Sequence, residues 1–351
     1  MSILWIEKSP FSVYDSDCGF FHKFLYSRNC CWKGVLSLME KKNNACSDCL
    51  KTSIGGQAVL EGIMMRGPEK TALSVRMPDG SIQTEVSPTP KKTWYKKAPF
   101  IRGIFNFFES MKEGYTYLMR SAELSGSLEE EESEFEKKLR AKLGDKYNTV
   151  FESVIMVLAV CLALGLFMFL PAFLVKQVQP FIGSNVLLTA IESCMKLAIF
   201  FVYLYAVSHM EDIKRTFMYH GAEHKCIFCY EHGEELTVEN VRKYTRFHPR
   251  CGTSFIVITL ILSILVFSFI SWGNVWTRVI IKLLCLPITM SLAYECIKFA
   301  GRHDNTFTRI LSAPGLWTQR LTTREPDDEM IEVAIAAMKE VIPENAKDAL
   351  Y

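Results

Sequence analysis

Residues 154–175 read VIMVLAVCLALGLFMFLPAFLV, a stretch without a charged side chain. A helix needs about 20 apolar residues to cross the hydrocarbon core of a bilayer, and this stretch is long enough. The composition of the whole chain agrees, because 49% of its 351 residues are hydrophobic and the mean hydropathy is +0.12. The sequence therefore predicts an integral membrane protein, with this stretch as its first span.

Three further apolar stretches follow, at about 186–208, 253–272 and 279–300. The stretch at 253–272 is uncharged and rich in β-branched residues, which a membrane helix tolerates because its backbone groups are bonded internally. The four stretches together predict a mainly α-helical integral membrane protein, in which residues 149–300 form a four-helix transmembrane bundle.

The loop between the second and third predicted spans carries most of the basic residues near the membrane. These are Lys214, Arg215, Lys225, Arg242, Lys243, Arg246 and Arg250. The turns on the other side are short and nearly uncharged, with Arg278 as their main exception. Because short basic loops stay on the cytosolic side, we predict a multi-pass protein of the cell membrane. Both termini and the loop 209–252 would then lie in the cytosol, and the first partner would be the lipid bilayer.

Charged side chains also fall inside the second and fourth predicted spans, where charge is costly. They are Glu192, Lys196, Lys282, Glu295 and Lys298. Glu192 and Lys196 are four residues apart and can pair on one helix face, and Glu192 and Lys282 are expected at similar depth. One interpretation is a structural salt link that fixes helix packing. The other is a polar path or proton relay, as in a transporter, but four spans without an evident repeat would then require an oligomer.

The composition divides the rest of the chain into further segments. Residues 1–50 lack a periodic apolar pattern, and we expect them to form a poorly ordered extension. Residues 51–125 predict a small cytosolic α+β unit, because alternating residues flank a Pro78-Asp79-Gly80 turn in the manner of a β-hairpin. Residues 126–148 are dense in Glu and Lys, which is typical of a charged helical linker.

Two amphipathic helices are expected outside the spans. The first, at 100–118, has an apolar stripe at helical spacing. Nearby basic residues favour a position in the membrane interface, and packing against the spans is the alternative. The second lies in the cytosolic tail 301–351, where an apolar face over 330–341 predicts a docking surface.

The chemistry is concentrated in residues 219–255, where four of the seven histidines fall. His220 and His224 are four residues apart, so that on a helix both project from one face and can hold one metal ion. Glu223 stands between them in the order H-x-x-E-H. This order is the inverted zinc protease motif, in which two histidines bind zinc and the glutamate activates a water.

A second compact ligand pair, His248 and Cys251, follows just before the third span. Imidazole and thiolate together suit zinc or iron better than magnesium, so the expected cofactor is a divalent metal, with zinc preferred. Secondary candidates are Cys229 and Glu295, the latter as a further ligand or as a partner that orients a histidine. Arg242 and Arg246 are four residues apart and either bind an anionic group or form a solvated face.

Five blocks of sequence, in consistent order, resemble the bacterial DUF1385 family of YqhQ-type proteins. They are IGGQAVLEGIMMRGP at 54–68, YHGAEHKCIFCYE at 219–231, LTVENVR at 236–242, HPRCGTSF at 248–255 and LTTREPDDEMIEVAI at 321–335. The resemblance covers about 51–342 and leaves 1–50 outside. It implies a multi-pass membrane protein, described as a predicted metal-dependent enzyme, with His220, Glu223, His224, His248 and Cys251 as motif positions. It implies no substrate.

Two functions of different class remain open at this point. The first is a metal-dependent hydrolase that acts at the membrane surface on a lipid head group or a membrane-near peptide, with Glu223 as general base. The second is a non-enzymatic membrane scaffold, in which a closed His/Cys metal site stabilises a docking surface for a cytosolic or membrane protein partner. A catalytic zinc keeps one position open for water, so the number of protein ligands separates them. We predict no nucleic-acid partner.

Overall fold

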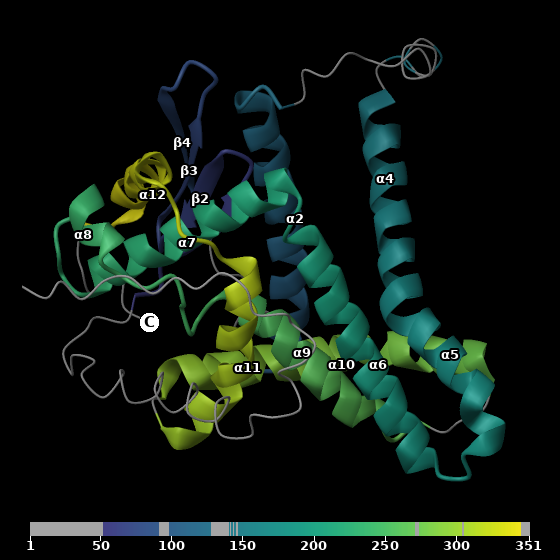
Figure 1. Cartoon of the computed structure of the whole chain (residues 1–351). Helices are drawn as coiled ribbons and strands as arrows, with labels where there is room; N and C mark the ends of the chain where they lie inside the picture. Colours follow the sequence, from purple (N-terminus) through teal and green to yellow (C-terminus); the bar gives the residue numbers. More distant parts are fainter. Residues whose placement is uncertain are drawn as a thin grey trace, which may run out of the picture. The chain divides into compact units, whose positions relative to one another are not determined.

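The computed structural model describes residues 52–90, 98–127, 147–270, 274–303 and 305–344, together with 140, 142 and 144. All of these belong to one compact unit, Cys49–Tyr351. The described part is mostly helical and has a small sheet near its N-terminal end (Figure 1). The extension expected at 1–50 and most of the linker expected at 126–148 lie outside the described residues.

The sheet is an antiparallel meander whose four strands follow one another in chain order. They are β1 (Gly55–Val59), β2 (Gly62–Arg66), β3 (Lys70–Arg76) and β4 (Ile82–Pro88). The turn expected around Pro78-Asp79-Gly80 joins β3 to β4. The carboxylate of Asp79 accepts a hydrogen bond from the Ser81 backbone N–H at 2.9 Å, and Gly80 has a φ of +84°, which glycine adopts without steric penalty.

One face of the sheet is covered by two helices from distant parts of the sequence, α7 (Glu211–Glu231) and α12 (Asp328–Val341), with the short α8 (Val238–Arg242) beside them (Figure 1). The core between them is apolar and buried, and includes Ile63, Met65, Ala72, Tyr219, Cys226, Met330, Ala334 and Met338. The apolar face expected at 330–341 therefore packs on the sheet. The unit expected from 51–125 therefore shares its core with helices from the loop 209–252 and from the tail 301–351.

The opposite face of the sheet is covered by α2 (Ile101–Leu124), which packs Tyr117 and Leu124 on a second apolar cluster. Gly103 of the same helix lies against α10 (Val275–Arg302), so close that an added Cβ would be 2.8 Å from the Ser291 Cα. The large side chains of Phe105 and Phe108 remain exposed. The helix expected at 100–118 thus packs against a candidate span and also leaves an apolar face uncovered.

Within the described residues, three helical segments are long and apolar enough to cross a membrane. The first, Ser153–Phe181, runs through α4 (Tyr147–Leu164), the π-helical turn η4 (Gly165–Phe169), α5 (Leu170–Val178) and the 3₁₀ turn η5 (Gln179–Phe181). The second is α6 (Asn185–Val207), and the third is Val275–Ala300 of α10. These segments match the first, second and fourth predicted spans.

The third predicted span is shorter than expected, so the four-helix bundle is not confirmed. The helix in this region, α9 (Gly252–Phe267), has 16 residues. At 1.5 Å per residue it is about 24 Å long, whereas the hydrocarbon core of a bilayer is about 30 Å thick. The helix ends at Phe267, where the Ser268 hydroxyl donates a hydrogen bond to the Leu265 carbonyl at 2.7 Å.

A further helix that the sequence analysis did not anticipate, α11 (Thr306–Thr322), packs along α9. Their approach is close, because an added Cβ at Gly315 would lie 2.3 Å from the Ser254 hydroxyl. Asn305 begins the helix with a capping box that also uses Thr308. The packing of α11 on α9 brings its last residue, Thr322, to the part of the molecule where α7 carries its histidines.

Candidate metal centre

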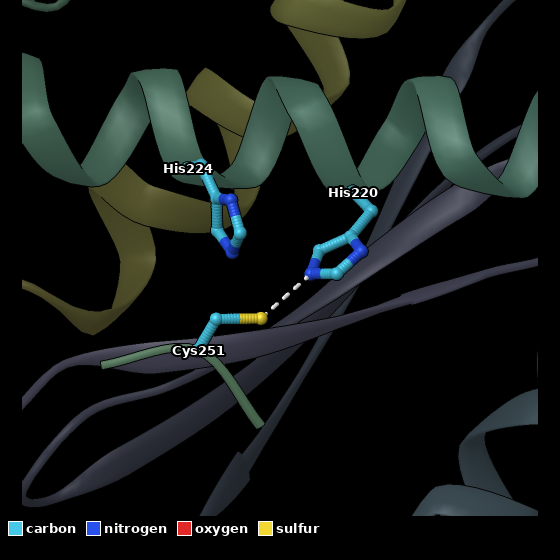
Figure 2. A group of neighbouring side chains, drawn as sticks. All are labelled: His220, His224 and Cys251. Carbon is cyan, nitrogen blue, oxygen red and sulfur yellow. Dashed lines mark hydrogen bonds between the residues drawn. The ribbon is translucent and has the colours of Figure 1, made fainter. Parts of the chain in front are cut away.

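Two histidines of α7 and the cysteine that begins α9 form a compact cluster. His220 and His224 are one helical turn apart, and both side chains point to the same side of α7 (Figure 2). Cys251 is the N-cap residue of α9, and its sulfur lies between the two rings and below them in the figure. One ligand atom of each residue lies within 4.8 Å of the other two. A single metal ion can bridge atoms at this spacing.

The tautomer of each histidine is set by a backbone carbonyl. His220 Nδ1 donates to the carbonyl of Thr322 at 2.8 Å, and His224 Nδ1 donates to the carbonyl of Arg246 at 2.6 Å. A carbonyl oxygen only accepts, so the proton of each neutral ring resides on Nδ1. Each Nε2 is then left with its lone pair directed to the cluster. Metal-binding histidines in proteins are oriented by second partners of this kind.

The thiol of Cys251 is the third member, with its sulfur 3.1 Å from His220 Nε2. Burial by itself would raise the pKa of this thiol, but its interactions with His224 and Thr253 outweigh burial, so that the pKa is lowered. Burial lowers the pKa of His224, which keeps this ring in the neutral, metal-binding form. Both directions suit a thiolate and neutral imidazoles as ligands.

Glu223 is buried beside the cluster and has an oxygen without a partner. Its side chain is 5% exposed, and among the described residues no group donates to its Oε2. Burial raises the pKa of Glu223 to about 7. The carboxyl lies against Gly56 of β1, where an added Cβ would be 3.1 Å from the carboxyl carbon. A buried carboxyl with an unsatisfied oxygen next to two histidines and a cysteine can accept a proton in that site.

His248 lies next to this cluster but is directed elsewhere. Its ring is tilted by 35° from that of His224, with 5.4 Å between the ring centres. Its Nδ1 accepts from the Arg250 backbone N–H at 3.3 Å, and its Nε2 is 3.9 Å from a carboxylate oxygen of Glu231. Glu231 also binds the guanidinium of Arg250 and, at 2.8 Å, the backbone N–H of Thr52. The described cluster therefore combines His220, His224 and Cys251, and places His248 in a neighbouring ionic network.

The secondary candidates from the sequence have other partners. Glu295 forms an ion pair with Arg102 of α2, and Arg242 forms one with Asp328 at the start of α12. Cys229 is buried in the apolar core between α7 and α12. Arg246 binds both the carbonyl and the hydroxyl of Thr323, the latter at 3.0 Å, and lies 3.6 Å from Glu325.

Sequence reasoning missed the segment 322–325, which holds the cluster from the tail side. The Thr322 carbonyl accepts from His220, Thr323 binds Arg246, and the Arg324 backbone N–H donates to the Phe217 carbonyl at 2.8 Å. Gly221 allows this approach, because an added Cβ would lie 2.1 Å from the Arg324 carbonyl oxygen. The letters LTTRE were part of the quoted family blocks, but backbone acceptors have no side-chain signature that would assign them a role.

Comparison with known proteins agrees with the resemblance noted from the motifs. Residues 98–344 match a family model described as "Protein of unknown function (DUF1385)". A relative named "Uncharacterized protein YqhQ", from Bacillus subtilis (strain 168), is 37% identical over 293 residues, which cover 82% of this chain and 92% of the relative. No solved structure matches the chain.

Proposed function

This chain belongs to the DUF1385 family, and from its buried cluster of two histidines and a cysteine we propose that it is a membrane-bound zinc-dependent hydrolase. His220, His224 and Cys251 would hold the metal, and Glu223 would be the general base. The substrate would be a hydrolysable bond reached at the membrane surface, in a lipid head group or in a membrane-near peptide.

The observation that carries this proposal is the number of convergent ligands. Three ligand atoms meet within 4.8 Å, while His248 Nε2 lies 3.9 Å from Glu231. Catalytic zinc sites have three protein ligands and an open fourth position, whereas structural sites have four protein ligands. The arrangement supports the open site. It gives less support to the alternative, a scaffold in which His248 completes a closed site.

The residues around the site fit this chemistry. Zinc in such a site supplies Lewis acidity and activates water for attack on a carbonyl or phosphoryl group. Thr322 and Arg246, through their carbonyls, hold the two imidazoles in the ligand tautomer. Glu223, buried and with Oε2 unsatisfied, would take a proton from the attacking water and deliver it to the leaving group.

The membrane part of the proposal has four spans, with α9 as a short one. In a locally thinner bilayer, or with its flanking residues at the interface, a helix of about 24 Å can still span. The basic residues of the loop 209–252 support a cytosolic position for the cluster. Cys251 caps the first turn of α9, so the metal would sit at the cytosolic end of that helix.

The test is metal content together with coordination. We would purify the full chain in lipid nanodiscs and measure bound metal for the wild type, Glu223→Gln and His220→Ala. His232→Ala is the matched control, because His232 is an exposed histidine at the end of the same helix. We expect about one zinc per chain in the wild type, in Glu223→Gln and in the control, and a loss in His220→Ala. Glu223→Gln should nevertheless fail to complement a strain that lacks the gene.

An open site also binds an added ligand. After cobalt replacement, a hydroxamate should change the visible spectrum of the wild type, because it occupies the free position. The scaffold function is favoured over the hydrolase if hydroxamate leaves the cobalt spectrum unchanged and only substitutions of the metal-binding residues abolish complementation. If the purified wild type contains no stoichiometric metal, both forms of the proposal fail.

A further inference from the structure

The two halves of α2 pack on different parts of the molecule (Figure 1). In the first half, Gly103 packs on α10, and the ring centre of Phe107 lies 6.0 Å from that of Phe255 in α9. In the second half, Gly114 lies against β1, where an added Cβ would be 2.7 Å from the side-chain oxygen of Gln57. The helix therefore joins the candidate membrane helices to the sheet on which α7 packs.

The exposed side chains also differ between the two halves of α2. Those in 100–108 are all apolar and between 43% and 61% exposed, and they are Phe100, Ile101, Phe105 and Phe108. After this point most exposed side chains are polar, and they are Ser110, Met111, Lys112, Thr116, Leu118 and Glu123. Thr116 is 11 residues after Phe105, which is about three helical turns. One face of the helix thus changes from apolar to polar along its length.

The polar groups at the start of α2 have partners within the chain. The carboxylate of Glu295 in α10 accepts the Phe100 backbone N–H at 3.2 Å and the Arg102 Nε–H at 2.7 Å. The backbone N–H groups of Ile101 and Arg102 donate to carbonyls two and four residues earlier, at 2.8 and 3.1 Å. The first N–H groups of a helix have no partner within the helix, and in hydrocarbon they must be satisfied by the protein. The start of α2 meets this requirement.

The surface beside the apolar half of α2 belongs to a candidate membrane span. On α10, Ile288 lies about one turn before the contact with Gly103, and Phe299 lies about one turn after Glu295. Both side chains are apolar, and they are 61% and 43% exposed. Lipid is the expected environment of apolar side chains on a membrane span. The apolar half of α2 continues this surface, so the same lipid would cover it.

The length of the apolar half and the composition of the preceding segment also favour lipid. Residues 101–108 extend about 12 Å at 1.5 Å per residue, and one leaflet of the hydrocarbon core is about 15 Å thick. The sequence just before α2 reads KKTWYKK at 91–97. Lysines are attracted to anionic lipid surfaces, and Trp and Tyr are enriched at membrane interfaces. These features favour the bilayer over a second copy of the chain or a soluble protein.

We infer that residues 100–108 of α2 insert into the cytosolic leaflet, while residues 110–124 lie in the cytosol and carry the sheet. This inference rests on the membrane part of the proposed function. It also gives α2 a role for the candidate metal centre. Gln57 contacts α2, and its neighbour Gly56 contacts Glu223 of α7 on the other face of the sheet. A membrane-anchored α2 would hold the centre close to the surface at which the substrate is reached.

The experiment places the photoreactive residue p-benzoylphenylalanine at one position at a time in the full chain. Phe105 and Phe108 test the apolar half, and Thr116 is the matched control on the same helix face. Leu284, which is 71% exposed within the candidate span of α10, reports on the span itself. Each chain is irradiated in vesicles of phosphatidylcholine and phosphatidylglycerol. Mass spectrometry then distinguishes a lipid adduct, a covalent dimer and an unmodified chain.

We expect lipid adducts of similar yield at Leu284, Phe105 and Phe108, and a fall to background at Thr116. If Leu284 gives lipid adducts but Phe105 and Phe108 give none, the inference is overturned while the membrane part of the proposed function stands. Covalent dimers at Phe105 and Phe108 in place of lipid adducts would overturn it too, and would make this surface an interface between copies. Equal lipid adducts at Thr116 and Phe105 would contradict the division of the helix. If Leu284 gives no lipid adduct, the membrane part of the proposed function fails and this inference fails with it.

Discussion

Replacing Gly221 by alanine tests whether the contact between α7 and the tail segment holds the candidate site together. The added Cβ would lie 2.1 Å from the carbonyl oxygen of Arg324. Ordinary contact between these atoms needs more than 3 Å, so the helix and the tail must separate by about 1 Å. Thr322, two residues earlier, accepts the hydrogen bond from His220 Nδ1, and this bond lengthens when the tail moves.

The expected magnitude follows from three contributions. Overpacking of this kind costs about 1–3 kcal/mol, and weakening of one hydrogen bond costs about 1 kcal/mol. Alanine is better than glycine inside a helix by about 1 kcal/mol, which acts in the opposite direction. The net loss of folding free energy should be about 2 kcal/mol. Loss of the partner of a metal-binding histidine should also lower zinc affinity by about 10- to 100-fold.

The assay has two readouts, thermal unfolding of the metal-free chain and zinc affinity by competition with a chelator. Gly55→Ala is the control, because an added Cβ at this position of β1 meets no atom within 4 Å. It should leave both readouts nearly unchanged. The reasoning is refuted if Gly221→Ala is as stable as the wild type or more stable, as helix propensity alone predicts, and binds zinc equally well.

Three other substitutions probe the contacts around the core and the site. The Arg246 guanidinium binds Thr323, and the Arg246 backbone carbonyl accepts from His224. Arg246→Lys loses the planar contact with Thr323 that fixes this carbonyl, so zinc affinity should fall about tenfold in the chelator assay. Equal affinity would contradict this role. Glu192→Gln leaves its two cationic partners buried without a counter-charge, which should cost about 3–5 kcal/mol in thermal unfolding experiments, and an unchanged melting temperature would count against the ion pairs. Arg215 lowers the pKa of Glu61 from its usual 4.5 through a hydrogen bond of 2.5 Å. The stabilisation is therefore complete above about pH 4.5 and is lost as the pH falls through the lowered pKa. It should be below about 1 kcal/mol because the pair is partly exposed. The stability difference between the wild type and Arg215→Met should therefore shrink as the pH falls below about 4.5.

Local patterns in the sequence predicted the parts of the site that one helix determines. His220 and His224 share a face of α7 because they are four residues apart. His248 and Cys251 were predicted as a second pair, but their spacing cannot tell which of them reaches the histidines. In the structure, the cap of α9 directs Cys251 into the cluster, and Glu231 attracts His248 away from it.

The parts that were not predicted depend on contacts between distant segments. The strand pattern indicated the β3–β4 hairpin but could not indicate that α7 and α12 cover the sheet, because hydrophobic periodicity does not identify a partner. Hydropathy predicted a full span at 253–272. The helix ends earlier, at Phe267, with Ser268 as its C-cap residue, and an average over a window does not locate a helix end.

X-ray absorption at the zinc edge of the purified full chain tests the central claim most directly. The account predicts about one zinc per chain with one sulfur neighbour at about 2.3 Å and nitrogen or oxygen neighbours at about 2.0–2.1 Å, one of which exchanges when a hydroxamate is added. A chain without stoichiometric metal, or a zinc shell that lacks sulfur, would contradict the His220–His224–Cys251 site.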